Sequence, residues 1–141
     1  VITKAQFGHS LSQRLYERYF QTSANKEYAE FMARDWDADN LTPTEETRVQ
    51  MAILTYLVDI FDVYDKVQSG LVDKSHLDTR MNTLKLGVMK TKNAKLVWSY
   101  WKWNRTKEFV QWFENEIYEG DEDKLSTEEI IKKSTELNTL R

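Results

Sequence analysis

The sequence predicts an all-α fold, a single-domain bundle of about six or seven helices around a long central helix at about residues 43–68. Two observations predict this class. The 141 residues include only one proline and four glycines, so few residues interrupt a helix. Apolar residues also recur every three or four positions, which is the period of one helical face, and they do not alternate as in a strand. A chain of this length suffices for one hydrophobic core.

Short apolar patterns predict the first two helices. Every fourth residue of one early segment is apolar, which predicts a helix from about Thr3 to Gln21 with Phe7, Leu11, Leu15 and Tyr19 on one face. Asn25 is a suitable N-cap for a second helix. The buried side of that second helix is expected to carry Tyr28, Phe31, Met32 and Trp36.

The central helix has the strongest start signal in the chain. Thr42 and Glu45 form a capping box, and Pro43 occupies the first helical position, where its missing N–H costs nothing. A wide apolar arc continues to Val67, and Gly70 is the expected C-terminal cap.

Three more helices are expected before residue 119. An amphipathic pattern starting at Leu77 predicts a helix that ends near Lys90. Asn93 is expected to cap an aromatic helix that reaches about Asn104, and Thr106 is expected to cap the next helix.

The chain is therefore expected to divide into a helical domain at residues 1–118 and an acidic segment at residues 119–141. That segment is predicted to be a loop followed by a short C-terminal helix, because Ser126 and Glu129 make a second capping box.

The stretch WSYWKWNRTKEFVQWF, residues 98–113, holds four of the five tryptophans. Helical spacing favours a core, with Trp98, Trp101 and Trp112 buried against the central helix. Four basic residues are interleaved with the rings, and they define an alternative, an anion-binding patch made of Lys95, Lys102, Arg105 and Lys107. In that alternative the basic aromatic segment 90–112 binds a membrane surface or a nucleic acid.

Charge is unevenly distributed along the chain. Residues 79–107 contain eight basic residues and no acidic one, whereas residues 108–129 contain nine acidic residues and one lysine. This polarity favours a polyanionic partner or self-association through the acidic segment. The net charge of −3 makes a nucleic-acid partner the less favoured of these.

The segment DWDADNLTPTEE raises a calcium hypothesis. Positions 1, 3, 5 and 12 of a calcium loop would be Asp35, Asp37, Asp39 and Glu46. Asn40 stands at the position where such loops have glycine, and the chain has no second loop. Acidic residues before a helix also favour its N-terminal dipole, so no metal site is assigned.

The remaining polar residues give no catalytic pattern. Asp59, Asp62 and Asp65 lie on one side of the central helix, where they are expected to be solvated or to pair with a basic helix. The two histidines, His9 and His76, have no partner pattern typical of catalysis. Without a cysteine or a phosphate-binding loop, we expect neither an enzyme nor a cofactor.

Three motifs resemble a loose group of small bacterial all-α proteins of uncharacterised function. They are LYERYF at residues 15–20, NLTPTEETR at residues 40–48, and the series Trp98, Asn104, Arg105, Phe109 and Phe113. The resemblance covers about residues 10–118. It implies an all-helical domain and, because many members have one, an N-terminal membrane anchor upstream of Val1. It implies no catalytic residue.

The sequence thus favours a non-enzymatic helical interaction or scaffolding module in the cytoplasm, with a protein partner or a second copy as its ligand. A module at a membrane surface or on a nucleic acid is the alternative, and a calcium-responsive helical protein is the second alternative.

Overall fold

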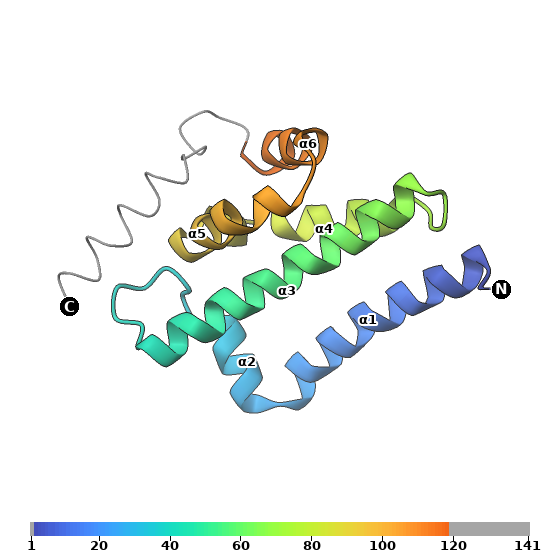
Figure 1. Cartoon of the computed structure of the whole chain (residues 1–141). Helices are drawn as coiled ribbons and strands as arrows, with labels where there is room; N and C mark the ends of the chain where they lie inside the picture. Colours follow the sequence, from blue (N-terminus) through green and yellow to red (C-terminus); the bar gives the residue numbers. More distant parts are fainter. Residues whose placement is uncertain (1, 119–141) are drawn as a thin grey trace. The chain divides into compact units, whose positions relative to one another are not determined.

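The computed structural model describes residues 2–118. Within them the chain forms six α-helices, two 3₁₀ turns and no strand, which confirms the all-α prediction (Figure 1). In chain order the elements are α1 (Lys4–Ala24), α2 (Lys26–Ala33), α3 (Pro43–Gln68), α4 (Ser75–Leu84), η1 (Val88–Lys90), α5 (Lys92–Trp101), η2 (Lys102–Asn104) and α6 (Lys107–Ile117). The acidic loop and C-terminal helix expected at residues 119–141 lie outside the described residues.

Polar caps fix most helix starts as the sequence predicts. Thr42 Oγ1 accepts a hydrogen bond from the Glu45 N–H, and the Glu45 carboxylate accepts one from the Thr42 N–H. Asn25 and Thr106 cap α2 and α6 in the same way, through a side-chain oxygen. Each cap satisfies a backbone N–H that the helix itself leaves without a partner.

Several boundaries differ from the prediction. Helix α2 ends at Ala33, so Trp36, which was expected on its buried side, is buried in the segment that follows α2. The helix expected to reach Lys90 ends at Leu84, because Gly87 takes a φ of +124°, which no helix accommodates. Thr91 rather than Asn93 caps α5, since the Thr91 hydroxyl accepts from the Ala94 N–H. The Asn93 side chain instead accepts a hydrogen bond from Gln50.

The described chain falls into two compact units, and α3 contributes to both. The first unit combines residues 2–35 with 58–80, and the second combines residues 36–57 with 81–118.

In the first unit α1 runs antiparallel to the C-terminal half of α3 (Figure 1). Lys66 Nζ lies over the Phe7 ring near the start of α1. Closer to the C-terminal end of α1, Arg18 pairs with Asp59. At the other side of α1, Gly8 lies against α4, where a Cβ would come within 3.2 Å of the His76 ring. The missing side chain of Gly8 therefore allows α1 and α4 to approach closely.

In the second unit α5 and α6 pack through aromatic rings. The Trp98 ring lies 4.4 Å from Phe113 and 6.5 Å from Phe109, between ring centres. Trp98 Nε1 donates a hydrogen bond to Glu114, so the polar edge of this buried ring has a partner. The Tyr118 hydroxyl donates to the Met89 carbonyl and fixes the end of α6.

The expectation that Trp101 is buried is wrong. Trp98 is 3% exposed and Trp112 is half-buried, but Trp101 is 39% exposed. Trp101, the last residue of α5, points about 60° away from Trp98 around the helix, and Phe109 and Phe113 of α6 pack against Trp98.

Two substitutions distinguish these tryptophans. We expect Trp98→Ala to lower the free energy of unfolding by about 3–5 kcal/mol, because it leaves a cavity between α5 and α6 and removes the partner of Glu114. Trp103→Ala should change it by less than about 0.5 kcal/mol, because that ring lies in solvent. Urea denaturation of both variants measures the difference; equal losses would contradict it.

Candidate functional site

The acidic loop before α3 contacts the start of α5. Asp37 accepts a hydrogen bond from the Lys92 N–H, the first N–H of α5, and Asp39 lies 3.4 Å from Lys92 Nζ. Within residues 2–118 no group of three or more histidine, cysteine, aspartate or glutamate residues is arranged to hold a metal ion. The loop carboxylates thus complement the positive N-terminal end of α5.

The four residues of the predicted anion-binding patch have different surroundings. Lys102 Nζ lies 3.6 Å from Glu114, and its side chain is largely buried. The Arg105 guanidinium packs over the Phe109 ring at 4.5 Å. Lys95 is half-buried, and Lys107 is exposed at the start of α6. Two of the four cations are thus held by groups of the same unit.

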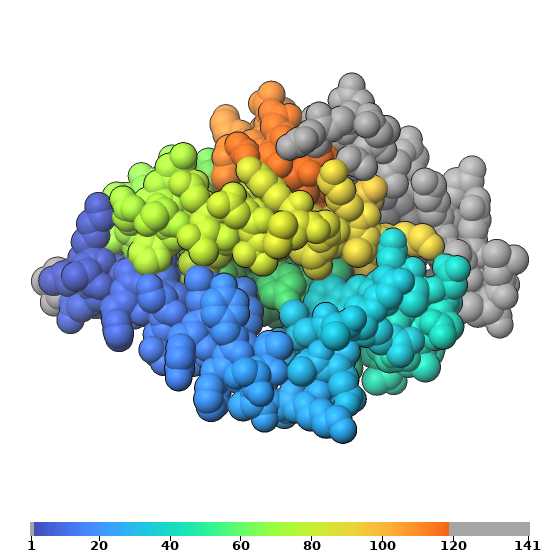
Figure 2. Space-filling view, turned by 180° about the vertical axis from the view of Figure 1, so that it is seen from behind, coloured from blue at the N-terminus to red at the C-terminus, as the bar shows by residue number. Residues whose placement is uncertain are grey.

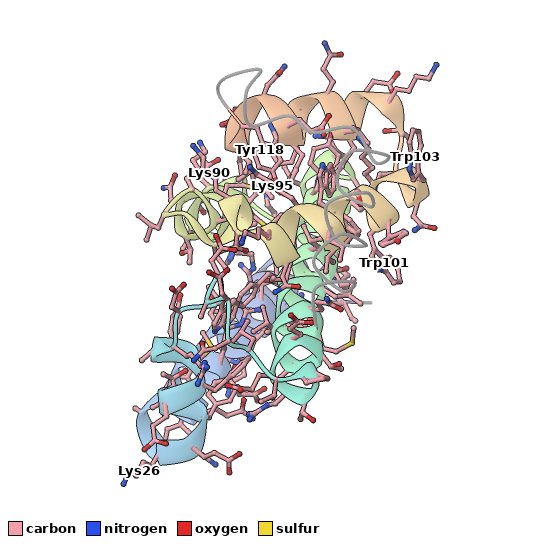
Figure 3. All side chains as sticks on the ribbon, turned by 90° about the vertical axis from the view of Figure 1, so that its left-hand side faces the viewer. Lys26, Lys90, Lys95, Trp101, Trp103 and Tyr118 are labelled. Carbon is pink, nitrogen blue, oxygen red and sulfur yellow. The ribbon has the colours of Figure 1, made fainter. Side chains whose placement is uncertain are left out.

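The basic segment is also divided in space. In Figure 3, Lys90 and Lys95 lie apart from Trp101 and Trp103, which occupy the other end of α5. Lys85, which directly follows α4, pairs with Glu116 of α6 at 2.7 Å. Part of the charge polarity of the sequence is therefore neutralised within the second unit.

Three large rings are exposed where α5 passes into η2. Tyr100 is 54% exposed, Trp101 39% and Trp103 74%. Lys102 Nζ lies 5.4 Å above the Trp103 ring, a cation–π contact that orients this indole. We call Tyr100, Trp101 and Trp103 the α5 ring surface. Apolar side chains exposed singly are ordinary, whereas three exposed rings within four residues are less common.

A second group of polar residues forms a buried ion network in the first unit. Asp59 of α3 is almost fully buried and receives three arginines, at 2.6 Å from Arg14, 3.3 Å from Arg18 and 2.7 Å from Arg80. Arg80 also donates to the main-chain carbonyls of Leu11 and His76. Because arginines of α1 and of α4 both pair with Asp59 of α3, the network holds the three helices together.

Asp62 extends this network toward solvent. Its carboxylate accepts from Lys66, four residues on, and from Arg14 at 3.1 Å. Burial by itself raises the pKa of Asp62, but the bonds from Lys66 and Arg14 outweigh burial and hold its pKa below the ordinary 3.8. The same contacts raise the pKa of Arg14 although burial lowers it.

The expectation that the three aspartates of α3 are solvated or paired with basic residues is thus met by pairing at Asp59 and Asp62, whereas Asp65 is exposed. The sequence pattern did not predict which basic residues pair with these aspartates. A signal was present, since Arg14 and Arg18 are four residues apart and lie on the side of α1 that carries Leu11. Of the two histidines, His9 is exposed and the His76 ring lies against Gly8.

Removing the shared carboxylate should destabilise the first unit. We expect Asp59→Ala to lower the free energy of unfolding by about 3–5 kcal/mol, because three guanidinium groups then lose the charge that compensates them. Asp65→Ala, on the same helix but exposed, should cost less than about 1 kcal/mol. Thermal denaturation at pH 7 compares them, and a tolerant Asp59→Ala variant would show that the network is dispensable.

The lowered pKa of Asp62 predicts an acid effect of defined sign. A carboxyl whose pKa is lower in the folded state contributes stability above its ordinary value of 3.8, and the contribution disappears as the pH falls through the folded value. When the pH falls from 5 to 2, the melting temperature of the Asp62→Asn variant should therefore fall less than that of the unchanged chain. Parallel melting curves over this range give the measurement; identical slopes for both proteins would contradict it.

Within the described residues, no helix combines the length and the apolar character that crossing a bilayer requires. The chain matches no protein-family model, no curated protein and no solved structure. The resemblance to small bacterial helical proteins stays an expectation, and the geometry of the exposed side chains is the basis for a functional proposal.

Proposed function

We propose that the chain is a non-catalytic helical interaction module that docks a protein partner on the α5 ring surface. The observation that carries the proposal is the exposure of Trp103 beside Tyr100 and Trp101. Tryptophan and tyrosine are the residues that most often supply the binding energy of protein interfaces, since each offers a large apolar area and loses little conformational freedom.

The charges near the rings favour a protein over a polyanion. A nucleic acid or an anionic membrane is held by cations that face it together with the rings. Here Lys102 pairs with Glu114 and Arg105 packs on Phe109, so both cations already have partners inside the unit. Interface cores are typically rich in aromatic residues, as this surface is, and the Lys102 cation over Trp103 is balanced by Glu114.

The proposed partner is a protein with an apolar groove wide enough for an indole, and the exposed Lys107, four residues after Trp103 in the chain, suits an acidic residue on its rim. The proposal keeps the cytoplasmic location expected from the sequence. A membrane-surface or nucleic-acid role of the same rings is the alternative that an experiment must separate.

Substitution of the rings tests the proposal. The double variant Trp101→Ala and Trp103→Ala should keep its melting temperature but bind a purified partner at least about 30-fold more weakly, since each central ring contributes about 2 kcal/mol or more. Partners are first captured by crosslinking to the full chain and then titrated by calorimetry. The matched control is Met51→Ala with Leu86→Ala, two exposed apolar side chains that belong neither to the α5 ring surface nor to α1.

The outcome can also go against the proposal. Equal affinity of the ring variant and the control would remove the α5 ring surface from the interaction. Ring-dependent binding to anionic vesicles or to single-stranded RNA, with no protein partner, would favour the alternative.

A further inference from the structure

Helix α1 has its charged and aromatic residues on unusual sides. Arg14 and Arg18 point into the ion network at Asp59, while Tyr16, Tyr19 and Phe20 are 56–60% exposed. The inner side is apolar as well, since Leu11 is buried there, so the rings form a second aromatic side where a surface helix normally carries polar residues. Helix α1, in blue, is visible at the molecular surface in Figure 2.

The outer face is also free of charge. With about 100° between successive residues, the positions within about 60° of Tyr16 run from Ala5 to Ser23 over about 27 Å of helix. Every residue on this face is exposed, and none is lysine, arginine, aspartate or glutamate, in a chain that is 30% charged. Such a face has no group that recognises a phosphate or an anionic lipid, whereas depletion of charge is typical of the centre of a protein interface.

The distribution of side-chain size along the face suits an antiparallel copy of itself. Its N-terminal half carries Ala5, His9, Ser12 and Gln13, and its C-terminal half carries Tyr16, Tyr19, Phe20 and Ser23. Antiparallel pairing lays Tyr16 on Ser12 and Tyr19 on His9, so that each of these rings meets a side chain smaller than itself. Parallel pairing would oppose rings to rings and leave a gap beside the small residues.

We propose that a second copy of this chain covers the outer face of α1, with the two α1 helices antiparallel about a two-fold axis near residue 14. Ser12 of one copy then faces Tyr16 of the other, and Ala5 faces Ser23. A two-fold contact of this kind uses the same patch on both copies, and an uncharged patch meets itself without repulsion. The stacked Tyr16 and Phe20 rings, 6.1 Å apart between centres, form the main ridge.

The area sets the strength of the dimer. Three rings of about 150–250 Å² each, a little more than half exposed, offer about 250–450 Å² per copy, and the small residues add to this. A stable interface buries about 800 Å² per partner, so the contact gives a weak, reversible dimer. This inference concerns a different unit from the α5 ring surface and does not depend on the proposed function.

Sedimentation equilibrium of the full chain, up to about 1 mM, tests the dimer. The average mass should rise from the monomer toward the dimer with concentration. Tyr16→Glu, which places a charge in the middle of an exposed face, should stay monomeric while its circular dichroism and melting temperature are unchanged. Tyr16→Phe and the control Tyr100→Glu on α5 should associate like the unchanged chain. Because no charges take part, added salt should not weaken the association.

Crosslinking tests the geometry. The chain has no cysteine, so Ala5→Cys and Ser23→Cys variants each carry a single thiol. A short bismaleimide should join the two variants to each other more readily than it joins either to itself.

Four results would overturn the proposal. They are a monomer at every concentration, association of Tyr16→Glu equal to that of the unchanged chain, preferential Ser23→Cys self-crosslinking, and dissociation by salt. A monomer that binds zwitterionic vesicles through Tyr16 would identify a lipid surface as the occupant instead.

Discussion

The Asp59 carboxylate is the constraint on which the first unit depends. A buried carboxylate is costly unless charged donors surround it, and here three arginines from two helices do so. The network therefore decides which side of α1 faces α3. It draws Arg14 and Arg18 inward, and a helix of 3.6 residues per turn must then carry the residues halfway round on its outer side. The exposure of Tyr16 and Phe20 is a consequence of satisfying Asp59.

The second unit follows a different rule. Its core is aromatic, and each buried ring with a polar edge has a partner: Trp98 with Glu114, and Tyr118 with the Met89 carbonyl. Glu114 in turn lies near Lys102, so one carboxylate orients both a core indole and the cation above Trp103. The α5 ring surface is thus connected to the core by a short chain of contacts. A rigid support of this kind keeps exposed rings ordered and lowers the entropy lost on binding.

The two proposals place contacts with other molecules at exposed rings on two different helices. The α5 ring surface has cations beside it, whereas the outer face of α1 has none. Different partners suit them for that reason: a protein with an apolar groove and an acidic rim for the first, and an identical uncharged face for the second.

The sequence by itself determined the helices. Capping residues such as Thr42 and Asn25, the proline at position 43 and the apolar spacing act over a few residues, and their hydrogen bonds form within one helical turn. Only the tertiary structure decided what the polar and aromatic residues contact. Asp59 meets Arg14 across 45 positions of sequence, and Asp37 meets the start of α5 across 55. Spacing predicted that Trp98 and Trp101 share a face, but α6 packs against Trp98 and Trp101 is exposed. Contacts between distant segments depend on how helices pack, and helical periodicity specifies a face without specifying its neighbour.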